Sequence, residues 1–361
     1  MRQHTVIQHT LFDEHDFLNI RFPKPQYLGA KYIHCDWIAQ WIPDDVKVVL
    51  DAFSGSQSVA FMCKRLGKSV LSNDFMKFNS EIGKALIENT HEILENDDLN
   101  ILFSPNSDPS YYNLMENIFT DLFFIREETA FLDAFRSNVR FLKNDYKKSL
   151  ALAIMNRAMS RKVTMGHFGH TQALAYAANP ERVKRNRSLI RPLKTIFMEL
   201  KDDYNEAVFD NGENCTSYNQ NILDLLPTLP KVDLVYFDPP YCDSHADYQS
   251  FYHLPETYTN YWKDKEFING TKRYSPKKVS GFDTKKEIIN SFKTMFSLSD
   301  NIPYWIISYN DRSYPDIDTL VDMAAQYRQI HIERKPYHYG RGGKGSVAGS
   351  SEVLIICTPI N

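Results

Sequence analysis

The chain has 361 residues, of which 43% are hydrophobic and 24% charged, the proportions of a soluble globular protein. Its apolar runs are well short of the ~20 residues that span a bilayer, and its first residues lack a signal-peptide core, so we expect a cytoplasmic protein without membrane contact. The net charge of −3 is no nucleic-acid signature by itself. Five scattered cysteines have no metal-ligand spacing, which predicts reduced thiols and no metal site: Cys35, Cys63, Cys215, Cys242 and Cys357.

The first regular pattern follows an irregular lead-in of about twenty residues. From 48 to about 94 it alternates strand, helix, strand and helix, which is typical of a parallel α/β sheet. Residues 48–51 read as a buried strand that runs into a turn of small residues. Gly55 permits close backbone approach in this turn, and Ser56 or Ser58 is of the type that caps the following helix.

A second short strand, 69–72, ends next to Asp74 and Phe75. Dinucleotide-binding folds place a carboxylate here, one strand after a glycine turn, to bind a ribose hydroxyl pair. The turn lacks the three-glycine spacing of a pyrophosphate cradle. A nucleoside ligand without phosphates therefore fits better than a nicotinamide or flavin cofactor. A dinucleotide-binding fold of another kind is the alternative.

Between about 96 and 203 the sequence has no pattern typical of a β-strand. Residues 128–160 and 186–201 read as amphipathic helices, and Asn179-Pro180 marks a break. The pattern predicts a helical subdomain at 96–203 that interrupts the α/β fold.

This helical stretch contains a basic run, 157–194, in which nine Lys or Arg residues stand against one acid, Glu181. Such a run is often a solvated helical face, but here it flanks a loop, 166–171, suited to base-edge or backbone contacts. We therefore favour a surface that contacts phosphates. A weaker basic patch at 331–345 fits a flexible surface loop equally well. The candidate residues for phosphate or base-edge contacts are Arg157, Arg161, Lys162, His167, His170, Arg182, Lys184, Arg185 and Arg187.

Short strands resume at 215–220 and 232–237. The second must end at Asp238, because Pro239 and Pro240 have no N–H to give to a sheet. This corner suits a planar group with an exocyclic amine, whose two N–H bonds Asp238 and the Pro239 carbonyl would accept while Tyr241 stacks on its ring. An ordinary strand-to-loop turn explains the stretch equally well when it is taken alone.

The rest of the chain reads as a helix at 285–296, a strand at 304–309 and a helix at 317–327. Two final strands, near 329–334 and 352–357, predict an antiparallel hairpin at the edge of the sheet.

Three motifs, in the same order, resemble those of the Dam-type N6-adenine-specific DNA methyltransferases. Tyr27-Leu-Gly-Ala-Lys31 resembles the family motif that folds over the methionine end of the cofactor. Asp51-Ala-Phe-Ser-Gly55 resembles the cofactor loop, and Asp238-Pro-Pro-Tyr241 resembles the catalytic tetrapeptide. The stretch 156–169 is more loosely similar to the family's target-recognition segment. One departure is Gln57, which stands where the family usually has a second glycine.

The resemblance implies a Rossmann-like methyltransferase sheet, mostly parallel with an antiparallel edge hairpin, formed by 1–95 and 204–361. It implies S-adenosylmethionine as the cofactor and adenine of double-stranded DNA as the substrate, flipped out of the helix. The helical segment 96–203 would recognise the target. The expected catalytic residues are Asp238, Pro239, Pro240 and Tyr241. The expected cofactor contacts are Tyr27, Lys31, Asp51, Phe53, Ser54, Gly55, Ser56, Asp74, Phe75, Asn221, Ile222 and Asp238.

Several alternatives stay open at this point. The turn at 219–224 resembles the family segment that flanks the cofactor's adenine, where Asn221 would bond the ring's edge and Ile222 and Phe75 would sandwich its faces. A helix cap at Asn221 and a core isoleucine explain the turn equally well. A methyltransferase that acts on RNA or on a protein amide is the nearer rival function, and a non-catalytic DNA-binding module that keeps the fold is the farther one. The basic insertion between the cofactor loop and the tetrapeptide favours DNA. The sequence reveals neither the recognition site nor whether a restriction endonuclease accompanies the chain.

Overall fold

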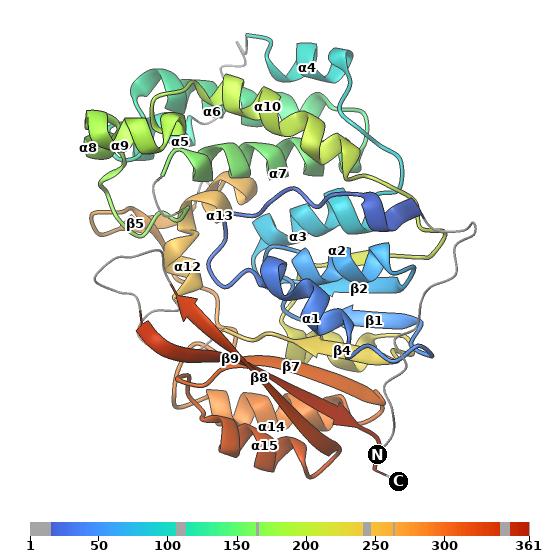
Figure 1. Cartoon of the computed structure of the whole chain (residues 1–361). Helices are drawn as coiled ribbons and strands as arrows, with labels where there is room; N and C mark the ends of the chain where they lie inside the picture. The colour runs from blue at the N-terminus through green and yellow to red at the C-terminus, as the bar shows by residue number, and fades with distance from the viewer. Residues whose placement is uncertain are drawn as a thin grey trace.

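A seven-stranded sheet forms the centre of the molecule (Figure 1). The computed structural model describes residues 16–105, 113–163, 166–240, 247–262, 264–339 and 347–360. The strand order is β3-β2-β1-β4-β7-β9-β8; β3 to β7 run parallel, and β9 is antiparallel to both of its neighbours. The strands are β1 (Val48–Asp51), β2 (Ser69–Asn73), β3 (Thr216–Tyr218), β4 (Leu234–Phe237), β7 (Tyr304–Asn310), β8 (Gln329–Tyr339) and β9 (Val347–Thr358). The predicted α/β class and the antiparallel edge hairpin are confirmed.

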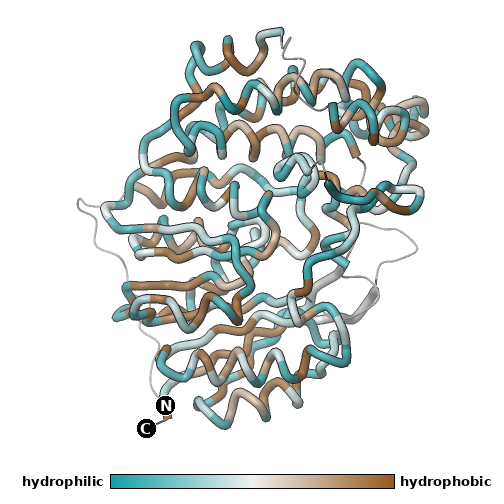
Figure 2. Tube along the Cα trace, turned by 180° about the vertical axis from the view of Figure 1, so that it is seen from behind, coloured by the Kyte–Doolittle hydropathy of each residue, from teal (hydrophilic) through white to brown (hydrophobic). Residues whose placement is uncertain are grey.

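Helices cover both faces of this sheet. On one face lie α1 (Cys35–Ala39), α2 (Ser58–Arg65) and α3 (Lys77–Gly83), and on the other α14 (Ile288–Leu298) and α15 (Ile317–Ala324), as Figure 1 shows. Successive strand residues alternate between the two faces, so Val49 belongs to one hydrophobic core and Leu50 to the other. Seen from behind, hydrophobic residues follow the central strands (Figure 2). A strand buried on both sides needs such a continuous apolar run.

A layer of helices lies above the sheet in Figure 1. It contains α4 (Asn96–Leu102), α5 (Leu114–Phe119), α6 (Arg126–Asn138), α7 (Asp145–Arg161), α8 (Ala173–Ala177), α9 (Pro180–Arg185) and α10 (Leu193–Glu206). Between α4 and α10 the described residues hold no strand, as the sequence predicted. Where this subdomain begins and ends as a folding unit stays a prediction.

One detail of the predicted helices was wrong. The stretch 128–160 forms two helices, because the chain extends at Leu142 and Asn144 caps α7 by accepting from Lys147 N. Asn179-Pro180 marks the predicted break, between α8 and α9, and also begins α9: Asn179 accepts from Arg182 N, and a proline at the first helical position loses no hydrogen bond.

The segment after β4 has elements that the sequence did not predict. They are α12 (Tyr248–Phe251), α13 (His253–Asn260), β5 (Glu266–Ile268) and β6 (Arg273–Ser275). This segment is fastened to the helical layer: the Arg136 guanidinium donates to the carbonyls of Tyr258 and Thr259, and Asn156 donates to Thr259 Oγ1. The helical layer is therefore built from two separate parts of the chain.

Short helical turns complete the fold. They are η1 (Asp16–Asn19), η2 (Lys31–His34), a π-helical turn η3 (Lys84–Glu88), η4 (Val139–Phe141), η5 (Arg187–Leu189), α11 (Ile222–Leu225) and η6 (Leu226–Thr228). Within the described parts of the chain, none of the helices combines the length and the apolar character that crossing a membrane requires.

Candidate active site

A pocket opens at the carboxyl ends of β1, β2 and β4. The chain runs from β1 to β2 and β3 on one side and then crosses to β4 on the other side of β1, and open α/β sheets bind ligands where the strand order reverses in this way. Twelve predicted site residues line this pocket: Tyr27, Lys31, Asp51, Phe53, Ser54, Gly55, Ser56, Asp74, Phe75, Asp238, Pro239 and Pro240. The structure therefore brings the three motifs together from positions far apart in the sequence.

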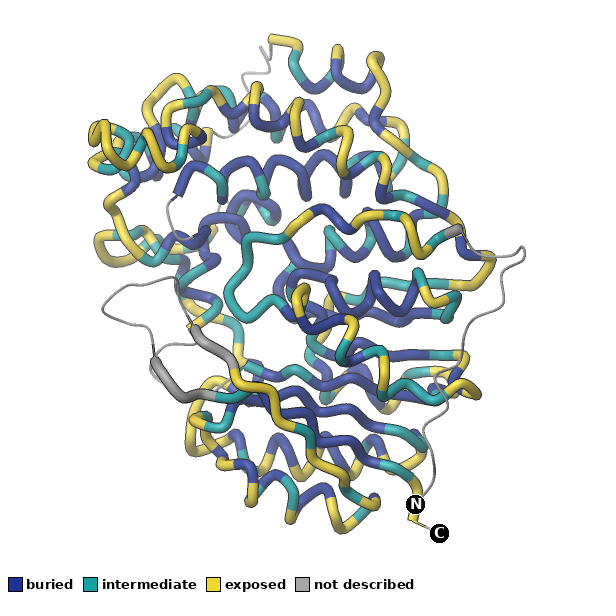
Figure 3. Tube along the Cα trace, viewed as in Figure 1, coloured by how far each residue is buried: buried dark blue, intermediate teal, exposed yellow. Residues whose placement is uncertain are grey.

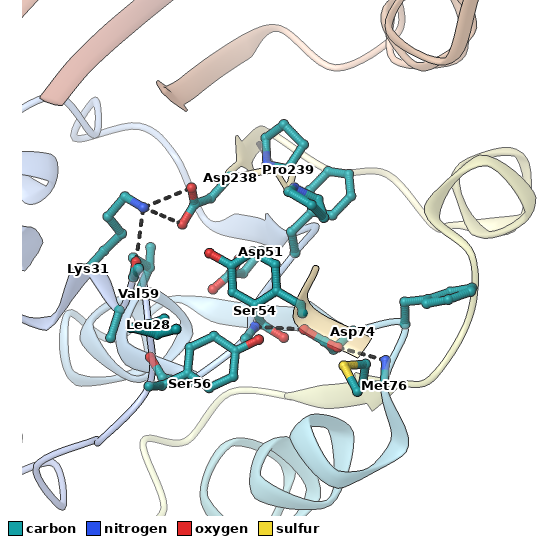
Figure 4. A pocket seen from close by; sticks show the side chains of 18 of the residues that line it. Leu28, Lys31, Asp51, Ser54, Ser56, Val59, Asp74, Met76, Asp238 and Pro239 are labelled. Atoms are coloured by element: carbon teal, nitrogen blue, oxygen red, sulfur yellow. Dashed lines mark hydrogen bonds and ion pairs between the residues drawn. The ribbon is translucent and has the colours of Figure 1, made fainter. Parts of the chain in front are cut away.

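Asp238 is held by a buried lysine (Figure 4). Lys31 Nζ, on a side chain only 5% exposed, lies 2.9 Å from Asp238 Oδ1 and 2.8 Å from Oδ2. It also donates to the Gly29 carbonyl at 3.0 Å. The ammonium therefore holds the carboxylate in one orientation at the pocket wall.

The same lysine is shared with a second acid. Glu352 Oε1 lies 3.5 Å from Lys31 Nζ and accepts a hydrogen bond of 2.8 Å from Ser308 Oγ. Glu352 is buried on β9 and Ser308 on β7. The sequence analysis missed Glu352, although a lone acid directly before the apolar run Val-Leu-Ile-Ile-Cys was a usable signal, since a charge is rarely buried without a partner.

Asp51 ends β1 and caps α2 from outside the helix. Its Oδ2 accepts from Ala60 N at 3.0 Å, while its buried Oδ1 has no hydrogen-bond partner among the described residues. Burial raises the pKa of the Asp51 carboxyl, and the nearby charge of Asp238 raises it further. Asp51 is one of the residues that line the pocket.

The helix cap itself differs from the prediction. Neither Ser56 nor Ser58 caps α2; Gln57 takes the cap position with φ +67°, and Ser58 is the first helical residue. The Gln57 side chain is fully buried and donates to Ser54 Oγ at 2.7 Å and to the Asn79 carbonyl at 3.1 Å. A positive φ explains why glycine is the usual residue here, and the two hydrogen bonds show what glutamine supplies instead.

Asp74 ties the glycine turn to the start of α3. Oδ2 accepts from Gly55 N at 2.8 Å, and Oδ1 accepts from Met76 N at 2.8 Å and Asn79 Nδ2 at 3.2 Å (Figure 4). Burial is the largest influence on this carboxyl and raises its pKa to about 6, against the effect of these donors. Asp74 therefore shapes the turn as well as lining the pocket.

Tyr27 packs over the glycine turn. A Cβ on Gly55 would lie 3.1 Å from Tyr27 Cε1, a tight contact, and the φ of +45° is strained for any other residue, so both favour glycine beneath the ring. The ring stacks on Tyr252 with centroids 4.5 Å apart and on Tyr248 at 5.8 Å. The N-terminal motif is thus fixed against the segment that follows β4.

Some predicted site residues lie elsewhere. Tyr241 is outside the described residues. Asn221 and Ile222 do not line the pocket: Asn221 accepts from Leu223 N to cap α11 and donates to the Ser280 carbonyl, and Ile222 is 3% exposed in the core. The expected role of Asn221 at the edge of an adenine ring, with Ile222 and Phe75 on its faces, stays a prediction; of the three residues, Phe75 lines the pocket.

The pocket also contains residues that sequence reasoning missed. Tyr248, Gln249, Ser280 and Asp283 line it from the segment after β4. The turn Ser280–Asp283 was recognisable from its Ser-Gly-Phe-Asp sequence, and in the structure Asp283 Oδ2 accepts from Ser280 N and Oγ.

The basic run divides into buried and exposed residues (Figure 3). On α8–α9 and the turn after it, Arg182, Lys184, Arg185 and Arg187 are exposed, as is His170. Arg182 lies over the Tyr176 ring at 3.7 Å. These residues remain available to a phosphate backbone.

Four predicted DNA contacts are engaged within the protein. Lys162 is 7% exposed and pairs with Glu128; Arg157 donates to Gln26 Oε1 at 2.7 Å and to the Lys24 carbonyl. His167 is 6% exposed, and burial lowers its pKa to about 4. Arg161, partly exposed, lies 3.8 Å from the Glu199 carboxylate. Lys162 and His167 are buried and Arg157 is partly buried, and the role of these three residues as DNA contacts stays a prediction.

Comparisons with known proteins agree with this geometry. A family model of D12 class N6 adenine-specific DNA methyltransferases matches residues 27–323. The Type II methyltransferase M2.HphI of Haemophilus parahaemolyticus is 31% identical over 345 residues, which cover 94% of this chain and 98% of that protein. The Modification methylase LlaI of Lactococcus lactis subsp. lactis is 25% identical over 360 residues, which cover 91% of this chain and 53% of that protein. With the family match running from Tyr27 through the tetrapeptide, the chain belongs to the D12 class of N6 adenine-specific DNA methyltransferases.

Proposed function

We propose that the chain transfers a methyl group from S-adenosylmethionine to the N6 amine of adenine in double-stranded DNA, and that the reaction takes place in the pocket beside Asp238. The observation that carries the proposal is the meeting of Asp238 and Pro239, at the end of β4, with the glycine turn after β1 in one pocket. Family membership supplies the reaction type.

The charge of the pocket supports this methyl donor. Among the described residues, four acidic side chains line it, Asp51, Asp74, Asp238 and Asp283, and one basic side chain, Lys31. S-adenosylmethionine supplies an electrophilic methyl group on a positively charged sulfonium, and its amino group is a second cation. The buried, unpartnered Oδ1 of Asp51 is an acceptor suited to such an amino group. We assign Tyr27, Phe53, Ser54, Gly55, Ser56 and Phe75 to the walls of the donor site.

Asp238 and the Pro239 carbonyl would accept the two N–H bonds of the adenine amine. This favours a pyramidal nitrogen whose lone pair points at the methyl group, and the carboxylate stabilises the positive charge that develops on the nitrogen. Lys31 keeps Asp238 oriented for this task. The substrate adenine must leave the duplex, at a cost of a few kcal/mol. Tyr241, next to Pro240, is proposed to stack on the flipped base.

The exposed cations of α9 and of the turn after it would contact the DNA backbone, and the segment 96–203 would position the duplex. Because one relative is named a type II methyltransferase and another a modification methylase, we propose that the chain is the modification partner of a separate restriction endonuclease.

A labelling assay tests the proposal. Purified protein is incubated with S-adenosylmethionine that carries a labelled methyl group and with duplex DNA, RNA or a protein mixture in turn. We expect label on duplex DNA, recovered as N6-methyladenine. Label on RNA or on protein instead would assign another substrate.

Asp238→Ala is the matched variant for this assay. We expect turnover to fall about 100-fold or more, as when a group that stabilises the transition state is removed. Donor affinity should be largely kept, because the other walls of the pocket remain. Turnover within about tenfold of wild type, a barrier change of only ~1.4 kcal/mol, would contradict the role of Asp238.

A further inference from the structure

The β5–β6 hairpin is separate from the main sheet. Its two strands pair only with each other, with Ile268 opposite Arg273. The turn between them is fixed, since Asn269 Oδ1 accepts from Thr271 N at 3.0 Å and from Thr271 Oγ1 at 2.8 Å. Asn269, Gly270 and Lys272 are exposed. The hairpin thus presents a short, ordered, polar tip to solvent.

The base of the hairpin is anchored in the protein. Phe267 packs edge-on against Phe119 with centroids 5.9 Å apart. Tyr274 is 2% exposed, packs on Trp262 at 4.7 Å, and donates to Gln249 Oε1 at 3.2 Å. An immobile base and a solvated tip are what a recognition element requires.

The tip faces a second polar loop across a groove. Residues 169–172 line one wall, and residues 269–271 with Arg273 line the other. No apolar side chain is among them. Their types are His, Thr, Gln, Asn and Arg, which hydrogen-bond base edges, and glycines, which let a partner approach closely. The sequence analysis noticed the first wall, but the hairpin is not part of any motif that it used.

Both walls are fastened to α12, the helix that borders the catalytic pocket. Tyr248 and Gln249, its first two residues, line the pocket, and Gln249 also holds Tyr274 of the hairpin. Phe251, its last residue, accepts from Phe168 N at 2.7 Å, next to the other wall. At about 1.5 Å per residue, α12 spans only ~6 Å, so the contacts that anchor both walls lie close to the helix that borders the catalytic pocket. In Figure 1, β5 lies on the same side of the molecule as α8 and α9.

The charges of the hairpin suit a nucleic acid at its tip. Lys272 is exposed and has no ion pair among the described residues. Arg273 Nε donates a hydrogen bond to Thr271 Oγ1. The acids Asp264 and Glu266 are exposed at the other end, toward the base of the hairpin. Two cations farther along, Lys277 and Lys278, are paired with Asp247 and Glu256.

From these contacts we infer that the β5–β6 hairpin is a second DNA-reading element, which together with loop 169–172 holds the duplex beside the flipped adenine. A two-stranded ribbon fits the major groove of B-DNA. Arg273 reads a base edge and Lys272 contacts a phosphate. This inference rests on the proposed function, and it makes the hairpin a determinant of the recognition sequence.

The test uses the full chain, with Lys272→Ala and Arg273→Ala as variants and Lys231→Ala as the matched control. Lys231 is 88% exposed and precedes β4 at its amino end, away from the pocket edge. Each protein methylates the same genomic DNA, whose N6-methyladenines are then located by sequencing, and duplex binding is measured over a range of salt. Donor binding and thermal unfolding show whether each variant is folded.

Lys272→Ala should lower the slope of log affinity against log salt by about 0.9 and leave the methylated sequence unchanged. Arg273→Ala should relax the methylated sequence at one position, with about a tenfold loss of preference for the cognate duplex. If both variants match Lys231→Ala in salt slope and in sequence preference while DNA is still methylated, the hairpin inference is overturned and the proposed function stands. If the wild type methylates no DNA, it is the proposed function that fails.

Discussion

Asp74 shows how one side chain can serve both the fold and the site. Its two oxygens accept three hydrogen bonds from the glycine turn and from α3, and it lines the pocket as well. Its pKa of about 6 lies above its ordinary value of 3.8, so the folded state binds the proton more tightly than the unfolded chain does. The contribution of this group to the free energy of unfolding is therefore greatest at low pH and falls as the pH rises through that window.

Donor binding should have the opposite dependence on pH. A ribose hydroxyl pair donates best to ionised Asp74, so we expect affinity for S-adenosylmethionine to rise between about pH 5 and 7. Asp74→Asn should weaken binding by roughly 1.5–3 kcal/mol at neutral pH and flatten this rise. Calorimetry across the range measures both effects. An Asn variant with wild-type affinity would remove Asp74 from the donor site.

Glu352 influences the reaction through Lys31. The lysine lies between two acids, 2.8 Å from Asp238 and 3.5 Å from Glu352. Without the Glu352 charge, the ammonium would neutralise Asp238 more fully and make it a weaker acceptor for the adenine amine. Glu352→Gln, which keeps the shape and a partner for Ser308, should therefore lower turnover by about tenfold with donor and DNA affinities unchanged.

Ser308→Ala is the control for this substitution. It removes a hydrogen bond to Glu352 but leaves its charge, so turnover should fall less. The comparison is made by single-turnover kinetics at saturating DNA. Equal turnover in Glu352→Gln and wild type would show that this charge has no part in the chemistry.

At the scale of elements, the start of α2 is stabilised by an unusual pair of groups. Asp51 supplies the cap from the preceding strand, and Gln57 holds the turn in a left-handed conformation. Gln57→Gly would relieve backbone strain of about 1 kcal/mol but would remove a fully buried side chain with two hydrogen bonds.

The loss of the buried Gln57 side chain and its hydrogen bonds should destabilise the protein more than the relief of backbone strain stabilises it. We expect Gln57→Gly to lower the free energy of unfolding by about 1–3 kcal/mol, measured by urea denaturation. Donor affinity should change little, since Gln57 does not line the pocket. A variant more stable than wild type would mean that the strain dominates at this position.

At the scale of the whole molecule, the exposed cations of α9 are expected to contact phosphates. Neutralising Arg182, Lys184 and Arg185 together should weaken binding to cognate and unrelated duplexes equally, because phosphates carry no sequence information. For each phosphate that is no longer neutralised, the slope of log affinity against log salt should fall by about 0.9. An unchanged slope in the triple variant would mean that the run is only a solvated face.

Lys162→Ala tests the buried part of the same basic run, for comparison with the exposed cations of α9. Its ammonium pairs with Glu128 and donates to the Arg191 carbonyl at 2.9 Å, at 7% exposure. Removing it leaves a largely buried carboxylate unpaired, so we expect a lower free energy of unfolding with an unchanged salt slope. Thermal unfolding and the salt titration together distinguish the two roles.

The sequence by itself determined the features that depend on neighbouring residues. The strand at 48–51 and its glycine turn, the end of β4 at Asp238, and the final hairpin follow from periodicity and from the backbone limits of glycine and proline. The order of the motifs identified the family before any contact was known. Where local patterns were ambiguous, as for the helix break at 142–144, the prediction was wrong.

Only the tertiary structure decided which side chains are buried and what they pair with. Lys31 and Asp238 are 207 positions apart, and Glu352 comes to the same lysine from the last strand. Three expected DNA contacts, Lys162, Arg157 and His167, proved to have partners inside the protein. Burial and pairing depend on segments that the fold brings together across the whole chain, whereas sequence periodicity reports only on a residue's neighbours.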